Sequence, residues 1–93
     1  MRHEIGIETT DFERIFSGEK TFEIRLNDQD FQAADTVLLK ELRPSKTLAD
    51  AMARLDNNCF TGRQLSAEIG YVTSCHQQED YVVFSLVDVK PEW

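Results

Sequence analysis

Basic residues are scarce in this chain of 93 amino acids. Its 10 Lys and Arg residues stand against 17 Asp and Glu, which gives a formal net charge of −7 at pH 7. Proteins that bind nucleic acid through counterion release usually carry a basic face. A broad basic surface is therefore excluded, and any polyanion must bind locally, in a focused pocket.

Cysteine, glycine and long apolar runs are also scarce, with only 2 Cys and 4 Gly in the chain. Cys59 and Cys75 do not form a disulfide-rich pattern, so we expect a reduced, cytoplasmic protein without a secretory or membrane-spanning segment. No phosphate-binding glycine loop, dinucleotide fingerprint or nucleophilic triad is recognisable. Neither His3 nor His76 has the spacing of paired metal ligands, so no metal and no cofactor is expected.

The length predicts a single domain over residues 1–93, because an apolar fraction of 41% suffices for one hydrophobic core. Alternating or apolar segments predict strands over residues 3–7, 20–26, 36–42, 63–73 and 81–89. A Thr61–Gly62 turn precedes the fourth of these strands.

Two helices are expected between these strands. The first spans residues 10–17, with Thr10 and Glu13 at capping-box spacing and Gly18 placed to end it. The second is an insertion over residues 44–58, where apolar residues recur at helical spacing. Too few helices are present for a parallel doubly wound sheet. The fold class is therefore α+β, a small, bent, mainly antiparallel β-barrel of about five strands with an early helix and an inserted helix.

The strand over residues 20–26 concentrates charge. Its alternation puts Phe22, Ile24 and Leu26 on one face and Glu23 beside Arg25 on the other, with Lys20 leaning over them from the preceding turn. One interpretation is an ordinary ion pair on an exposed strand, which contributes little stability. The other is that the three charged groups converge on a ligand that needs both signs of charge.

The turn that follows this strand is polar. Asn27, Asp28 and Asp30 are typical turn formers, although either aspartate could instead orient Arg25. Phe31 is expected in the core, although an aromatic residue in a loop could also stack on a base. Tyr71 and Tyr81 are expected in the wall of the barrel with their hydroxyls at a rim, where one of them could stack on a ligand.

The pattern Gly-x-Lys-x-x-Glu-x-Arg, formed by Gly18, Lys20, Glu23 and Arg25, resembles the ASCH domain, a branch of the PUA-like β-barrels. The ordered set of His3, "SGEKTFEIRLNDQDF", "TGR" and "YVV" resembles more narrowly a small uncharacterised ASCH-like family of bacteria and phages. That family commonly has Gly before the Asp that opens the third strand. Ala34 stands there in this chain, so a positive φ is less expected.

The resemblance implies a PUA-like barrel with a cleft between the early helix and the sheet, binding RNA or a nucleotide-like small molecule. Lys20, Glu23 and Arg25 would line the cleft, with Arg63 as a second cation and His3 at its border. Arg25 and Lys20 suit phosphate or a base edge, and Glu23 could accept from an exocyclic amine.

Two alternatives stay open. A related ASCH branch hydrolyses N4-acylated cytidine, so Lys20 and Glu23 could be catalytic in an amidohydrolase or a ribonuclease. The branch's Thr is replaced here by Glu23, however, and a carboxylate keeps a neighbouring lysine charged, which opposes its use as a base. The acidic composition also suits a small, phage-encoded factor whose partner is another protein.

Overall fold

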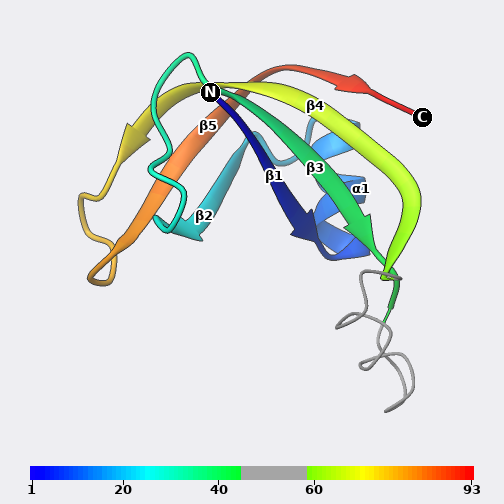
Figure 1. Ribbon diagram of the computed structural model, residues 1–93, viewed down its shortest axis with the longest axis horizontal. Coiled ribbons are helices and arrows are strands. Elements are labelled where there is room, and N and C mark those ends of the chain that lie inside the picture. The colour runs from blue at the N-terminus through cyan, green and yellow to red at the C-terminus, as the bar shows by residue number, and fades with distance from the viewer. Residues whose placement is uncertain (45–58) are drawn as a thin grey trace.

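The computed structural model describes residues 1–44 and 59–93, in which one helix lies against a five-stranded sheet (Figure 1). The insertion helix was predicted over residues 44–58. Apart from Pro44, these residues lie outside the described part of the chain. The elements in chain order are β1 (Arg2–Ile7), α1 (Thr9–Ser17), β2 (Phe22–Leu26), β3 (Thr36–Leu42), β4 (Phe60–Thr73) and β5 (Tyr81–Pro91).

The sheet is mixed and forms a half-barrel. Its strand order is β1-β3-β4-β5-β2; β1 pairs with β3 in parallel, and the other neighbours are antiparallel. The predicted bent and mainly antiparallel sheet is confirmed. Closure into a complete barrel is not observed among the described residues, because β1 and β2 remain edge strands that do not pair with each other.

The core fills the concave side of this sheet, where α1 also packs. Strict alternation on the strands places their inward residues in one apolar cluster with Phe12 and Ile15 of α1 and with Phe31, as predicted for Phe31. The strand residues of the cluster are Ile5, Ile7, Val37, Leu39, Leu65, Ala67, Ile69, Val82, Phe84 and Leu86. Helix and sheet therefore share one core, which fixes α1 beside the β1–β2 opening.

The ends of α1 agree only partly with the prediction. Gly18 adopts the left-handed conformation, φ 84°, that ends the helix, and this was expected. The capping box was wrong: the helix begins at Thr9 with Glu8 as N-cap and no side-chain cap, so Thr10 lies inside the first turn. Thr10 and Glu13 do have capping-box spacing, but only Glu8 separates β1 from α1. The helix therefore begins one residue earlier than expected.

Two backbone conformations correct the sequence analysis. Thr61 and Gly62 lie within β4 rather than in a turn before it, and Gly62 has φ 99°. Ala34 has φ 74°, although alanine made a positive φ less expected. The conformation is imposed by neighbouring hydrogen bonds: Ala34 donates its N–H to the Ile69 carbonyl at 2.8 Å, and Asp35 donates to Gln32 at 3.2 Å.

Candidate binding cleft

Strand β2 turns its charged face inward. Glu23 is 3% exposed, whereas Phe22, Ile24 and Leu26 on the opposite face are 43%, 49% and 47% exposed. The interpretation of Glu23 and Arg25 as a pair on an exposed surface is therefore wrong. A carboxylate that is removed from water needs partners. Lys20, just before β2, and Arg25, on β2, are the two cations beside Glu23.

Glu23 joins the two cations of the motif. Its Oε1 lies 3.3 Å from Lys20 Nζ, and its Oε2 accepts a hydrogen bond from Arg25 Nε at 3.2 Å. Lys20 also pairs with Asp11 of α1 at 3.2 Å. The predicted convergence of Lys20, Glu23 and Arg25 is thus present, with Asp11 as a member that sequence reasoning missed. The Lys20 amine is therefore engaged by two carboxylates, an arrangement that does not favour a role as base or nucleophile.

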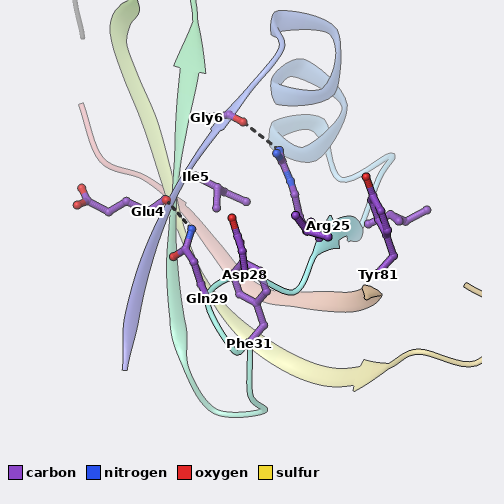
Figure 2. Close-up of a pocket in the computed structure, with 10 residues that line it drawn as sticks. Glu4, Ile5, Gly6, Arg25, Asp28, Gln29, Phe31 and Tyr81 are labelled. Carbon is purple, nitrogen blue, oxygen red and sulfur yellow. Dashed lines mark hydrogen bonds between the residues drawn. The ribbon is translucent and has the colours of Figure 1, made fainter. Parts of the chain in front are cut away.

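Arg25 spans the opening between the two edge strands. Its Nη2 donates to the carbonyl of Gly6 on β1 at 3.0 Å, as Figure 2 shows. A cavity of about 420 Å³ lies on one side of Arg25 and a second of about 350 Å³ on the other. The smaller cavity contains Lys20, Glu23 and Asp11, and both cavities share Gly6, Ile24 and Arg25. We call these two adjoining cavities the cleft.

The larger cavity is bordered by the turn after β2. Asn27 accepts a hydrogen bond from the Phe31 N–H at 2.9 Å and so bonds the backbone of the turn, as expected. Asp30 accepts a hydrogen bond from the side chain of Gln32 at 2.7 Å. Asp28 and Gln29 instead line the cavity, and Figure 2 shows their polar ends directed toward β1 beside Arg25. The sequence feature that could have indicated Asp28 and Gln29 as cavity residues is the polar turn directly after the charged strand.

Tyr81, at the start of β5, is a further residue of the cavity wall. It pairs with Leu26 across the β2–β5 ladder, and its side chain is partly exposed at the cavity. Glu4 contributes only backbone, because Figure 2 shows its side chain on the far side of β1. The groups that line the larger cavity therefore include one cation, one carboxylate, one amide and the aromatic rings of Phe31 and Tyr81.

His3 lies behind this cavity rather than in its wall. It is 2% exposed, and its Nε2 lies 2.8 Å from Asp35, while its Nδ1 lies 3.3 Å from the Gln29 side chain. Its hydrogen bond, together with that of the N-terminal amine, lowers the pKa of Asp35 to about 2. His3 thus helps to position the Gln29 side chain. His3 itself lines neither cavity, so its predicted place at the cleft border is not supported by a direct contact with the cleft.

Arg63 is held at the other end of the half-barrel. It donates to Glu41 at 2.9 and 2.6 Å and to Glu13 of α1 at 2.5 Å, and its guanidinium lies over the ring of Phe12. Glu41 is 3% exposed, and its bonds to Arg63 lower its pKa to about 2. Neither cavity of the cleft is lined by Arg63, so the structure does not bring it to the other predicted site residues.

Metal-ligating side chains do not gather in the described ranges: no group of three or more His, Cys, Asp or Glu residues is placed to hold an ion there. Across residues 1–44 and 59–93, Cys59 and Cys75 are both free thiols. No described helix is long and apolar enough to cross a membrane.

Comparison with known families matches residues 2–86 to a domain of unknown function, DUF3850. The chain belongs to this family. No curated protein matches it. The DUF3850 match covers β1, α1, β2, β3 and β4 and ends within β5, so it includes every residue of the cleft. Because the family description assigns no activity, inferences about function must come from the cleft itself.

Proposed function

We propose that this DUF3850 domain binds a nucleotide unit in the cleft, either as a free small molecule or within single-stranded RNA. The observation that supports this most directly is the Lys20–Glu23–Arg25 cluster on the inward face of an edge strand. Buried Glu23 orients two cations, and Arg25 stands between two open cavities. Sites of this kind, with a few placed polar groups in a concavity of about 300–1,000 Å³, are typical of small-ligand binding.

The charges in the cleft support a small ligand rather than a long polyanion. Lys20 is shared by Asp11 and Glu23, and Arg25 is bonded to Glu23 and to a backbone carbonyl. Two of the five N–H donors of Arg25 are used in these bonds, which leaves others for a ligand oxygen or ring nitrogen. With a net charge of −7, contacts to many phosphates are disfavoured.

We further propose that DUF3850 is a branch of the PUA-like barrels related to ASCH domains. A half-barrel of five strands with one early helix supports this, as does the position of Lys20, Glu23 and Arg25 where the family motif has them. The free thiols suit a cytoplasmic location. Hydrolysis of acylated cytidine receives less support, because Lys20 is paired with two carboxylates.

The test is a titration of fluorescently labelled, mixed-sequence single-stranded RNA and of ribonucleoside 5′-monophosphates with the wild type and Lys20→Ala/Arg25→Ala. We expect saturable binding by the wild type, at least a tenfold loss in the double variant, and a shallow salt dependence. The matched control is Arg2→Ala/Lys90→Ala, which removes the same charge from exposed positions outside the cleft.

Equal loss of binding in the two double variants would mean that charge alone matters, and no binding by the wild type would refute the proposal. Preference for monophosphates over RNA would assign the ligand to the small-molecule class. Thermal denaturation of each variant shows whether the change in binding accompanies a loss of folding.

A second candidate function is docking of another protein on the outer face of β2. Phe22, Ile24 and Leu26 form a row there, each more than two-fifths exposed, and Tyr81 lies beside Leu26 on β5. Contiguous apolar side chains on an edge strand are typical of an interaction surface. The substitution Phe22→Ser separates the two functions, because Phe22 lies on this face and lines neither cavity of the cleft, whereas Ile24 lines both.

A further inference from the structure

The four polar residues at the end of β2 do not share one role. Asn27 and Asp30 bond the turn, and Gln29 contacts His3 and the Glu4 carbonyl. Within residues 1–44 and 59–93, the carboxylate of Asp28 makes no hydrogen bond or ion pair. Among the four residues, Asp28 is therefore the one whose side chain has no polar partner in the described protein, and it lines the larger cavity.

Glu23 is unsuited to receive a ligand. It was expected to accept from an exocyclic amine, but it is 3% exposed and already accepts from Lys20 and Arg25. A ligand in the larger cavity would meet Asp28 as its carboxylate and Arg25 as its cation (Figure 2). Because an ionised carboxylate only accepts hydrogen bonds, it selects for N–H groups and repels carbonyl oxygens.

We infer that Asp28 determines specificity by accepting a hydrogen bond from the exocyclic amine of a nucleobase, while Arg25 donates to an acceptor on the same ring. This rests on the proposed nucleotide-binding function and names the ligand class more closely: an amino-bearing base, such as cytosine or adenine, rather than its keto counterpart. Uracil and hypoxanthine present a carbonyl oxygen at the position of that amine, which leaves Asp28 unpaired against a lone pair.

The neighbouring groups suit a flat ring. The ring of Phe31 lies at the base of the cavity, Tyr81 lies in its wall, and the amide of Gln29 is held in place by His3. An aromatic wall residue provides a surface for a base without discriminating between bases. Discrimination therefore falls to Asp28, Arg25 and Gln29, of which Asp28 is the one with no other contact among the described residues.

The experiment compares matched ligands by calorimetry: cytidine against uridine 5′-monophosphate, and adenosine against inosine 5′-monophosphate. Oligo(C) and oligo(U) provide the same comparison within RNA. In each nucleotide pair an amine is replaced by a carbonyl and the adjacent ring nitrogen gains a hydrogen, while the phosphate and the pyrimidine O2 or purine N7 acceptor available to Arg25 are unchanged. We expect the wild type to prefer the amino-bearing member of whichever pair it binds by about tenfold or more. In Asp28→Asn this ratio should fall to about twofold or less, because an amide also donates.

The control is Asp30→Asn, which makes the same charge change two residues away in a side chain that does not line the cavity. Asparagine also tolerates the left-handed backbone of this residue, φ 51°. We expect the ratio in this variant to equal that of the wild type, which separates local recognition from a general reduction of negative charge.

Equal affinities within each pair for the wild type, or a preference that persists in Asp28→Asn, would overturn the role of Asp28 and leave the proposed function standing. If the wild type bound no monophosphate and no oligonucleotide, both inferences would fail together. Amide NMR spectra of the two variants, recorded without ligand, show that the turn retains its structure.

Discussion

At the scale of single residues, burial rather than residue type decides what each charge does. Glu23 and Asp28 are both carboxylates near Arg25, but Glu23 is 3% exposed and bonded to two cations, while Asp28 is exposed and makes no bond within the described ranges. Glu23 holds the two cations of the cleft in place, and the carboxylate of Asp28 is available to a ligand. Sequence alone could propose both but could not assign these roles, since turn chemistry accounts for Asp28 equally well.

Ala34 carries a measurable cost in its left-handed conformation, φ 74°. A side chain raises the energy of this conformation by roughly 1–2 kcal/mol, while glycine adds a smaller penalty through the unfolded chain. We therefore expect Ala34→Gly to stabilise the protein by about 1 kcal/mol, measured by urea denaturation. Ala33→Gly, in the same exposed turn but without positive φ, is the control and should be neutral or slightly destabilising. A loss of stability in Ala34→Gly would contradict the strain argument.

At the scale of elements, the strands were predictable and the orientation of β2 was not. The bounds of β3 and the starts of β4 and β5 lie within a few residues of those expected, because alternation and turn residues mark them locally. Alternation does not say which face turns inward, since a period of two has two equal phases. The apolar residues Phe22, Ile24 and Leu26 suggest that their face of β2 turns inward, and this is wrong. The opposite face is buried, where Glu23 forms ion pairs with Lys20 and Arg25.

The helix is attached to the sheet by a charged cluster at the end opposite the larger cavity. Arg63 on β4 bonds Glu41 on β3 and Glu13 on α1, and its guanidinium lies 4.8 Å from the Phe12 ring centroid. The resemblance suggested Arg63 as a second cation of the cleft, and the sequence could not show its actual partners, which are far away along the chain. The contact with Glu13, for example, joins residues 50 positions apart, a pairing that no local pattern reveals.

This cluster predicts an acid-dependent stability. The folded-state pKa of Glu41 is about 2, below its ordinary value of 4.5, so its contribution is complete above pH 4.5 and is lost as pH falls toward 2. The partly exposed Arg63 is screened by solvent, and we expect a contribution of about 2 kcal/mol. Glu41→Gln should lower the free energy of unfolding by this amount at pH 7, and the difference should vanish near pH 2.

The measurement is urea denaturation of both proteins at intervals between pH 7 and pH 2. Glu68→Gln is the matched control, since Glu68 is exposed on β4 and its carboxylate makes no hydrogen bond or ion pair within the described ranges. Some acid sensitivity will remain in Glu41→Gln, because the pKa of Asp35 is also lowered to about 2. A difference between wild type and Glu41→Gln that stays constant down to pH 2 would rule out Glu41 as the titrating group.

At the scale of the molecule, the openness of the sheet creates the cleft. β1 and β2 end the sheet, and Arg25 of β2 bonds the Gly6 carbonyl of β1 across the opening. The sequence predicted a bent sheet but not where it would stay open, because closure depends on strand tilt and shear rather than on local pattern. The same opening leaves β2 as an edge strand of the sheet. The side chains of Phe22, Ile24 and Leu26 on its outer face are exposed to solvent.

Net charge is expected to keep this apolar face from associating. At pH 7 the charge of −7 provides repulsion between copies, and this repulsion disappears near the isoelectric point of about 4.7. We expect light scattering to rise near pH 4.7 in the wild type and to be strongly reduced in Ile24→Lys, which places a charge in the middle of the row. Gln78→Lys adds the same charge in an exposed loop and should shift the pH of the maximum without reducing it. If Gln78→Lys and Ile24→Lys suppressed scattering equally, net charge alone would account for solubility, and the face of β2 would have no special part in association.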